Sequence, residues 1–377
     1  MRSSKPTTYQ RPQYLPAVER KDCGLPRDAA RRSRPAGEAS PGSRSAAALL
    51  ADARTAITPV LRAAVATLGH PLDRMAGYHF GWCDTEGNLR AGAHGKGLRP
   101  ALTLAAAAAC GAPPADAVHA GAAVELLHNF TLVHDDVMDA DPLRHGRPTV
   151  WRVWGVTNAT LLGDALQALA FAVLSDGGVP EPVGAAAVIR LARTTATLCH
   201  GQYQDCDFET RPAVSVEDYL AMAAGKTAVL LGCSCALGAL CAGADSRTVA
   251  AFNTFGRNLG LAFQLVDDAI GIWGDPTVTG KPGLSDLRAK KRSFPVVCAL
   301  TSGTPAGSEL ARRYRDPRPL SQADAEYAAE LVAAAGGREQ TQQRADRALR
   351  AALDSLPDEL GCEDLLTLAH VVVQRNR

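Results

Sequence analysis

Long stretches dominated by alanine and leucine, separated by short segments rich in glycine and proline, make up most of this chain. The separating segments include "CGAPPAD", "DGGVPEP" and "GDPTVTGKPG", compositions that are typical of turns. Between them apolar residues recur at steps of three and four, as in Leu259, Phe263, Val266 and Ile270, which is the period of an amphipathic helix. Aromatic residues make up only 5% of a chain that is 46% hydrophobic, and this favours close-packed helices over a sheet. We therefore predict an all-α fold.

The first 44 residues differ from the rest of the chain in composition. They contain ten lysine or arginine residues and four acidic ones, a charge of +6, which leaves −5 for the remainder. Rich in proline, arginine and serine and without a hydrophobic period, this segment cannot bury enough apolar surface to offset its chain entropy. We expect a disordered basic tail over residues 1–44 and one helical domain over residues 45–377. The tail is either a solvated extension or a segment that docks to a partner or a protein compartment.

Composition also argues against several classes of protein. A net charge of +1 gives no indication of a nucleic-acid partner, and no apolar stretch of the length of a secretory signal follows the early positive charges. The ten cysteines show no zinc or disulfide spacing, so we interpret them as reduced thiols in a cytoplasmic protein. The uncharged stretch between Lys226 and Asp245 approaches the length of a membrane span. Its glycine, serine and cysteine content favours a buried helix, and we expect no transmembrane segment.

Three carboxylates follow an apolar run in "LVHDDVMD". On a helix Asp135 and Asp139 stand one turn apart on the same face, with Asp136 beside them, so their mutual repulsion is costly unless a cation lies there. Mg²⁺ meets this need through carboxylate oxygens and usually keeps water and substrate phosphate as further ligands. Taken alone, the motif fits a solvated helix end as well as a metal site.

A second acidic pair, Asp267 and Asp268 in "FQLVDDAIGIWGD", again follows an apolar helix face. Two such clusters indicate facing walls of one cavity. Around them lie cations suited to phosphate, because arginine grips it with two bonds and lysine acts as a point charge. These cations are Lys96, Arg99, Arg144, Lys226, Lys281, Lys290 and Lys291. Together the two sets predict a metal-diphosphate pocket.

These motifs resemble those of the trans-isoprenyl diphosphate synthases, the polyprenyl synthetase family, including its bacterial geranylgeranyl diphosphate synthases. The resemblance runs from about residue 50 to the C-terminus and includes, in family order, "GKGLRP", "VELLHNFTLVHDDVMD", "RHGRPT", "GDALQALAF", "GQYQD", "GKTA", "FQLVDD", "GDPTVTGK" and "DLRAKKRSFP". It implies a single-domain bundle of antiparallel helices around a deep central cavity. It also implies Mg²⁺-dependent head-to-tail (1′-4) condensation of isopentenyl diphosphate with an allylic diphosphate, with release of diphosphate, by a homodimer.

The resemblance also implies roles for single residues. Asp135 and Asp139, supported by Asp136, would hold two Mg²⁺ ions on the allylic diphosphate, and Asp267 with Asp268 would hold a third. The residues implied to contact the same diphosphate are Arg144, Lys226, Lys281 and Lys291. The residues implied to hold the diphosphate of isopentenyl diphosphate are Lys96, Arg99 and His128. Thr227 and Gln264 match positions that line the developing allylic cation.

Several of these residues have simpler interpretations. His128 on an apolar helix also fits a core histidine, and Gln202 and Asp205 in "GQYQD" also fit a polar helix face. His134, next to the first acidic cluster, is expected to support the cluster without binding the metal.

Two positions depart from the family pattern. The second motif usually ends in aspartate, but this chain has Gly271 there; Asp275, a further turn along, would then act through water. We expect Gly271→Asp to leave activity unchanged or to raise it. A pair of arginines usually follows the first motif, whereas this chain has Arg144-His145, which would weaken the binding of isopentenyl diphosphate and make it pH-sensitive.

Two other classes of function remain open from the sequence. A class I terpene cyclase also uses DDxxD, although we find no second metal motif of its usual type. A non-catalytic partner subunit of a prenyl synthase would keep the fold, and Gly271 and His145 are the features that favour it. Among synthases, product length follows a family pattern at the positions five and four before Asp135. This chain has an aromatic residue, Phe130, at the first of these positions and Thr131 at the second. The pattern implies a twenty-carbon product. The expected product is geranylgeranyl diphosphate, with farnesyl diphosphate as the main alternative.

Overall fold

The fold of the described residues is helical, as predicted. A computed structural model describes residues 44–90, 95–177, 183–274, 283–316 and 318–373. Within them the paired strands are β1 (Leu143–Arg144) and β2 (Arg147–Pro148), an antiparallel hairpin that pairs Leu143 with Pro148, and there is one isolated bridge between Cys83 and Leu89. Everything else that is regular is helix, so the alanine-rich composition does specify an all-α architecture.

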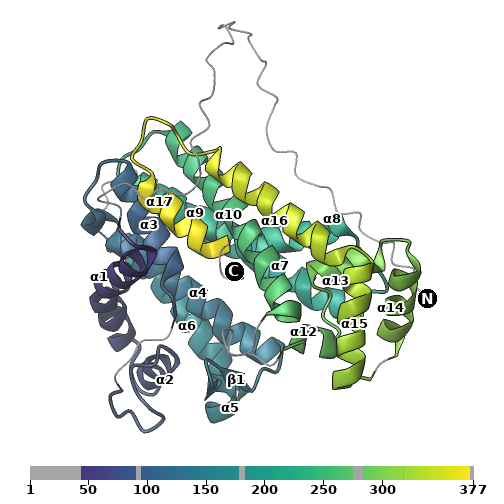
Figure 1. The fold of residues 1–377 in the computed structure, drawn as a ribbon. Helices are drawn as coiled ribbons and strands as arrows, with labels where there is room; N and C mark the ends of the chain where they lie inside the picture. The colour runs from purple at the N-terminus through teal and green to yellow at the C-terminus, as the bar shows by residue number, and fades with distance from the viewer. Residues whose placement is uncertain (1–43, 91–94, 178–182, 275–282, 317, 374–377) are drawn as a thin grey trace, which may run out of the picture. The chain divides into compact units, whose positions relative to one another are not determined.

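The regular structure of the N-terminal half consists of helices and one hairpin (Figure 1). In chain order they are α1 (Ala46–Ala66), α2 (Leu72–His79), α3 (Leu98–Ala109), the 3₁₀ turn η1 (Pro114–Ala117), α4 (Val118–Met138), α5 (Val150–Trp154), α6 (Val156–Ser175) and α7 (Val183–Thr210). The segment "CGAPPAD" forms the turn before α4, where Gly111 takes a left-handed conformation. The glycine and proline segments therefore mark helix boundaries, as the sequence indicated.

The C-terminal half continues the same pattern. Its elements are α8 (Val216–Ala223), the π-helix η2 (Ala224–Ala228), α9 (Val229–Cys241), α10 (Ser246–Trp273), α12 (Ser285–Arg288), α13 (Phe294–Leu300), α14 (Pro305–Arg315), α15 (Gln322–Ala334), α16 (Gly337–Leu353) and α17 (Glu363–Val373). Several begin at a side-chain cap: the carboxylate of Asp245 accepts from the N–H of Thr248 at 2.7 Å, and Ser215 forms a capping box with Asp218. Such caps satisfy backbone donors that would otherwise lack partners in the first turn.

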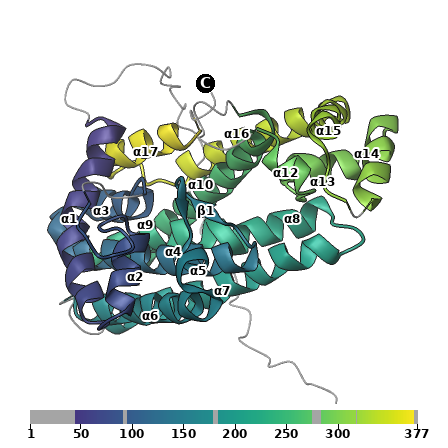
Figure 2. The same cartoon turned by 90° about the horizontal axis from the view of Figure 1, so that it is seen from below.

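Two long helices carry the acidic motifs into the centre of the bundle. α4 packs on α6, α3, α1 and α9, and α10 packs on α9 and α16. Both are lined by buried apolar side chains; the carboxylates lie in the last turn of α4 and, on α10, five and six residues before its end at Trp273. Seen from below, the hairpin and α5 lie beside the end of α4 (Figure 2). The packing of the bundle thus fixes where each acidic cluster lies.

Arg44 and Ser45 lie at the predicted boundary between the tail and the helical domain. The predicted tail falls outside the described residues except for Arg44, which forms ion pairs with Asp364 of α17 and, at 3.7 Å, with Asp52 of α1. Ser45 caps α1 by accepting from the N–H of Ala48. Arg44 and Ser45 therefore belong to the helical domain.

The described residues include cysteines and long apolar helices about which the sequence made predictions. Every cysteine in the described part of the chain is a free thiol, and Cys233 and Cys235 are buried as expected, whereas Cys199 is exposed and is not a core residue. Two described helical stretches, Val156–Ser175 and Val216–Cys241, are long and apolar enough to cross a membrane by length and composition alone. The second, with 78% of its apolar window buried inside the fold, packs as a core helix.

Candidate active site

Both acidic clusters lie at the C-terminal ends of helices. Asp135 and Asp136 lie in the last turn of α4 and Asp139 caps it, while Asp267 and Asp268 lie near the end of α10. The C-terminus of a helix carries a partial negative charge, so carboxylates there are destabilised unless cations compensate them. This effect is confined to the last turn, so the end of α4 favours positive charge at the first cluster.

The three carboxylates of the first cluster have different surroundings. Asp139 is exposed and Asp135 is partly buried, whereas Asp136 is buried and accepts hydrogen bonds from Nε and Nη2 of Arg144, both at 2.6 Å. Burial raises the pKa of Asp135 to about 6; the charge of Lys226 opposes this rise and that of Asp139 adds to it. Asp135 and Asp139 are thus the members available to a metal ion, and Asp136 holds an arginine.

The second cluster is divided in the same way. Asp267 is exposed, whereas buried Asp268 accepts hydrogen bonds from the hydroxyl of Tyr219, the backbone N–H of Phe294 at 2.7 Å and Nε2 of Gln264 at 2.9 Å. These bonds join α10 to α8 and α13. Asp268 therefore has little acceptor capacity left, and Asp267 is the better candidate ligand.

The ammonium group of Lys291 is within electrostatic range of carboxylates from both clusters. Burial alone would lower the pKa of Lys291, but the carboxylates of Asp205, Asp286, Asp139 and Asp268 raise it above its usual value. Asp139 follows α4 and Asp268 lies on α10, so one lysine lies within electrostatic reach of both clusters. The prediction that the clusters line opposite sides of one site is consistent with this placement.

A π-helical turn presents Lys226 and Thr227 to the site. It interrupts the continuous helix that runs from α8 into α9, and such bulges occur frequently at functional sites. Nζ of Lys226 bonds to the carboxylate of Asp205 on α7 at 2.5 Å. The hydroxyl of Thr227 donates to Oε1 of Gln264 on α10 at 2.7 Å. The residues that the resemblance assigns to the allylic cation therefore form one hydrogen-bonded chain from Thr227 through Gln264 to Asp268.

A second group of positive charges lies around His128, two turns before Asp135 on α4. Burial and the charges of Arg99, Arg144, His79 and His145 hold the pKa of His128 well below its usual range. His128 is accordingly neutral at pH 7, while Arg99 and Arg144 supply positive charge next to it. This concentration of positive charge suits an anion such as a diphosphate.

The hairpin sets the direction of Arg144. His145 and Gly146 form its two-residue turn, both with positive φ, 53° and 73°. Arg147 donates to the carbonyl oxygens of Tyr78 and Cys83, which ties the hairpin to α2 and the segment after it. A small pocket here is lined in part by His79, Asp136, Arg144 and His145.

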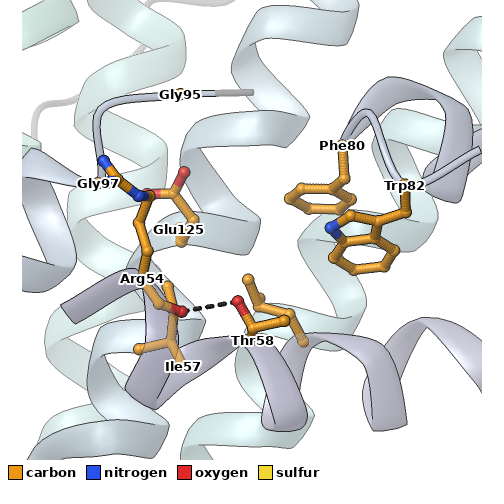
Figure 3. A pocket seen from close by; sticks show the side chains of 9 residues that line it. Arg54, Ile57, Thr58, Phe80, Trp82, Gly95, Gly97 and Glu125 are labelled. Carbon is orange, nitrogen blue, oxygen red and sulfur yellow. Dashed lines mark hydrogen bonds between the residues drawn. The ribbon is translucent and has the colours of Figure 1, made fainter. Parts of the chain in front are cut away.

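Lys96 is positioned by contacts of the glycine-rich segment before α3. Its carbonyl oxygen accepts from Nη1 of Arg54 on α1 at 3.2 Å. Gly97 has φ of 66°, and a Cβ there would lie 2.7 Å from Cγ of Arg54, so only glycine fits. Figure 3 shows the pocket beside this segment, with Glu125 and Arg54 near Gly97 and the stacked rings of Phe80 and Trp82 across from them.

Some predicted residues lie elsewhere or cannot be placed. Nζ of Lys290 donates to the carbonyl oxygens of Arg313 and Asp316, so it caps the end of α14 and does not support the prediction of a phosphate contact. Nε2 of His134 bonds to the carbonyl of Thr160 on α6 at 3.0 Å, so this side chain braces α4 against α6 and does not support the acidic cluster. Lys281 and Asp275 lie outside the described residues.

Other site residues were not anticipated from the sequence. Tyr219 binds Asp268, and Nε2 of His79 bonds to Oδ1 of Asn129 at 3.0 Å on the side of Arg144. Their helices are distant in sequence from the motifs they contact. In the sequence, the one sign that Tyr219 or His79 belongs to the site is a polar or aromatic residue on an apolar helix face. Such a residue also fits ordinary core packing.

The positions assigned to chain length lie just before the first cluster. Phe130 is buried and meets the ring of His134 edge to face at 4.9 Å between centroids. Thr131 is buried one turn before Asp135, and its hydroxyl donates to the carbonyl of His128 at 2.7 Å. The two side chains thus occupy adjacent faces of α4.

The donor set fits Mg²⁺ bound together with a phosphorylated substrate. In the part of the chain that the structure describes, no three His, Cys, Asp or Glu side chains already form a closed metal cage. Mg²⁺ needs no such cage, since it usually keeps several waters and takes one or two carboxylates plus substrate phosphates. Asp135, Asp139 and Asp267 offer carboxylate oxygens of this kind, the first two at a helix end that favours a cation.

Comparisons with known proteins agree with this geometry. A family model described as polyprenyl synthetase matches residues 82–332. The chain is 52% identical to a geranylgeranyl diphosphate synthase from Mycobacterium tuberculosis, over 87% of this chain and 93% of the relative. It is 43% identical to a (2E,6E)-farnesyl diphosphate synthase from Mycobacterium bovis, over 85% and 90%. A crystal structure of a polyprenyl synthetase from Streptomyces coelicolor A3(2) superposes with a TM-score of 0.81 at 44% identity, covering 86% of this chain and 99% of that one.

Proposed function

The chain belongs to the polyprenyl synthetase family, and from this premise we propose that it makes geranylgeranyl diphosphate from isopentenyl diphosphate and a shorter allylic diphosphate. The activity is that of a prenyltransferase. The residue assignments are supported by the carboxylates of both acidic clusters, Asp139 and Asp268, which raise the pKa of Lys291, and by the bonds of Lys226 to Asp205 and of Arg144 to Asp136. The product length rests on the relative with 52% identity and on the single aromatic side chain at Phe130.

The reaction breaks the C–O bond between the allylic carbon and its diphosphate. The electron pair leaves with the diphosphate, so negative charge grows on its oxygens. Lys226, Lys291 and Arg144 stabilise that charge where it develops, because their positions are already fixed by Asp205, the facing carboxylates and Asp136. Asp135, Asp139 and Asp267 would hold Mg²⁺, which the family uses and for which we propose three ions, and the bound metal would supply Lewis-acid stabilisation of the same charge.

The second half of the reaction joins the two substrates. The double bond of isopentenyl diphosphate attacks the allylic cation, a carbon–carbon bond forms, and a proton leaves the new chain for the departed diphosphate. Lys96, Arg99 and neutral His128 hold the diphosphate of isopentenyl diphosphate, while Thr227 and Gln264 direct their dipoles at the cation. The apolar sides of α4 and α10 exclude water that would quench it.

A homodimer is the assembly that we propose. α6 packs on α4 by one face, yet only 33% of its apolar window is buried in the chain. Val156 and Leu161 are 53% and 52% exposed, and a second copy would cover them symmetrically. Light scattering at micromolar concentration should give twice the mass of the chain. A monomer with full activity would contradict the dimer.

Localisation and the tail are further proposals. Free buried thiols fit a reducing compartment such as the cytoplasm. The basic tail either stays solvated or docks to a partner or protein compartment. If the tail docks to a partner or compartment, fusion of the tail to an unrelated protein should transfer that location or partner.

Turnover of the purified chain tests the function. With Mg²⁺ and labelled isopentenyl diphosphate it should elongate dimethylallyl, geranyl or farnesyl diphosphate, and dephosphorylated products should run as geranylgeraniol. Cyclised hydrocarbon would indicate a terpene cyclase. No turnover by a folded chain would indicate a non-catalytic partner subunit.

A further inference from the structure

Gly271 leaves a gap in the second acidic motif, and the structure shows what fills it. Gly271 lies on α10 one turn after Asp267. A Cβ placed on Gly271 would overlap Oδ2 of Asp286 and would lie 2.9 Å from its Cγ. The carboxylate of Asp286, which comes from α12, therefore occupies the space beside α10 into which a side chain at position 271 would project.

We propose that Asp286 supplies the third carboxylate of the second metal-binding cluster, in place of the side chain that Gly271 lacks. This inference rests on the proposed Mg²⁺-dependent function and extends it to a residue on a different helix. Residues four apart on a helix are neighbours, with Cβ atoms about 5–6 Å apart. A carboxylate at the position of a Cβ on residue 271 is thus one helical turn from Asp267, close enough for both to bind one hydrated ion.

The electrostatic surroundings of Asp286 place it in the same region. Its charge contributes to the rise in the pKa of Lys291, which is also near Asp205, Asp139 and Asp268. It adds to the rise in the pKa of Asp268 that is caused first by burial. Asp286 therefore belongs to the group of carboxylates around Lys291 and is not an isolated surface acid.

The fold holds Asp286 in place. The next residue, Leu287, is fully buried and lies in one core cluster with Ile272 of α10. The carbonyl of Asp286 accepts from the N–H of Lys291 at 2.8 Å, and the carbonyl of Arg288 accepts from the N–H of Leu320 at 3.2 Å. These contacts hold the backbone of α12 beside α10, the position from which the carboxylate of Asp286 reaches the space next to Gly271.

This arrangement reverses one expectation from the sequence. Gly271→Asp restores the family pattern and would be harmless if the space were open. Here its Cβ would displace Asp286 and bring a second negative charge against it. We therefore expect Gly271→Asp to weaken metal binding, and Gly271→Ala to do so through displacement alone.

Binding of Mn²⁺ in the presence of inorganic diphosphate, followed by electron paramagnetic resonance and calorimetry, tests the proposal without turnover. Asp286→Asn, which keeps the shape and removes the charge, should weaken Mn²⁺ binding by about 10- to 100-fold. Arg288→Ala, an exposed change on the same short helix, should leave it unchanged. Unchanged binding in folded Asp286→Asn would overturn the proposal, because a role only in helix structure would alter stability and not metal affinity.

The double variant Gly271→Asp/Asp286→Ala moves the carboxylate from α12 to α10. It should bind Mn²⁺ at least about tenfold more tightly than either single variant, since the two positions are interchangeable sources of one carboxylate. A double variant no better than the single ones, or a Gly271→Asp variant that binds as tightly as the parent, would contradict the proposal. Wild-type turnover is measured separately: normal Mn²⁺ binding without condensation would refute the proposed function and not the role of Asp286.

Discussion

Asp136 and Arg144 form a two-bond ion pair at 2.6 Å in which the carboxylate is almost completely buried, with 2% of its side chain exposed. The pair separates the first acidic motif into a structural member and two members that face the site. Removal of one partner from a buried pair leaves an uncompensated charge. The three aspartates should therefore respond differently to mutation.

Asp136→Ala should reduce the free energy of unfolding by about 1.5–3 kcal/mol, the range for a hydrogen bond to a charged group. Asp139→Ala, at an exposed position, should change it by less than about 0.5 kcal/mol. Urea unfolding of both variants in the absence of Mg²⁺ measures the difference. Equal stability of the two variants would show that the ion pair with Arg144 contributes little to the fold.

Asp135→Ala, Asp139→Ala and Asp267→Ala should each reduce Mg²⁺-dependent condensation by at least about 100-fold, as loss of a group that stabilises developing charge does. Helicity and unfolding midpoints should stay close to those of the parent, because these carboxylates bind ions and do not pack. Chelation of the metal with EDTA should abolish turnover of the parent. Addition of excess Mg²⁺ should restore that turnover. Activity within a few-fold of the parent in any of the three variants would refute the metal assignment for that residue.

The helical class and the approximate site could be predicted from the sequence, because both depend on local patterns. Apolar steps of three and four specify helices, and each acidic motif directly follows an apolar run in the sequence. The contacts of Asp268 could not be predicted: its partners Tyr219 and Phe294 lie 49 and 26 residues away and meet it only through tertiary packing. The same holds for Asp286, since no local signal places α12 against Gly271.

His79 should make stability sensitive to acid. Burial, followed by the charge of Arg144, lowers its pKa from 6.5 to about 3, while its bond to Asn129 opposes this and His145 and Arg147 add to it. Between these values the unfolded chain binds the proton and the folded chain does not. The contribution of His79 to the free energy of unfolding is therefore fully present above pH 6.5. As the pH is lowered from 6.5 towards 3, this contribution decreases by up to about 1.4 kcal/mol per pH unit.

His79→Gln keeps a donor for Asn129 and removes the titration. Urea unfolding at pH 7 and pH 5 should show a smaller loss of stability in His79→Gln than in the parent. His200→Gln, at an exposed position, is the matched control and should behave as the parent. The carboxylates with raised pKa stabilise the folded chain as the pH falls, but they are common to all three proteins and cancel in the comparison. An identical loss of stability between pH 7 and pH 5 in His79→Gln and in the parent would contradict the role assigned to His79.

The tail should be separable from catalysis if the cut respects the cap of α1. Deletion of residues 1–43 should preserve turnover, since this segment has no apolar period with which to complete the core. Deletion of residues 1–45 also removes the cap by Ser45 and the pairing of Arg44 with Asp364, and should cost about 1 kcal/mol of stability. Thermal unfolding and turnover of the two truncations are the measurements. Loss of active protein in the shorter deletion would show that the tail contributes to the fold.

Product length should be controlled from the face of α4 that precedes Asp135. A growing chain that starts at the acidic cluster and runs along α4 reaches Thr131 after one turn, about 5.4 Å, and Phe130 beside it. Phe130→Ala should open space next to His134 and lengthen the product beyond twenty carbons, whereas Thr131→Phe should narrow the path and favour fifteen. Thr131→Val is the matched control, because it keeps the side-chain shape and removes only the bond to the carbonyl of His128, so its product should remain at twenty. Chromatography of dephosphorylated products measures all three. An unchanged length in both Phe130→Ala and Thr131→Phe would place the end of the tunnel away from this face of α4.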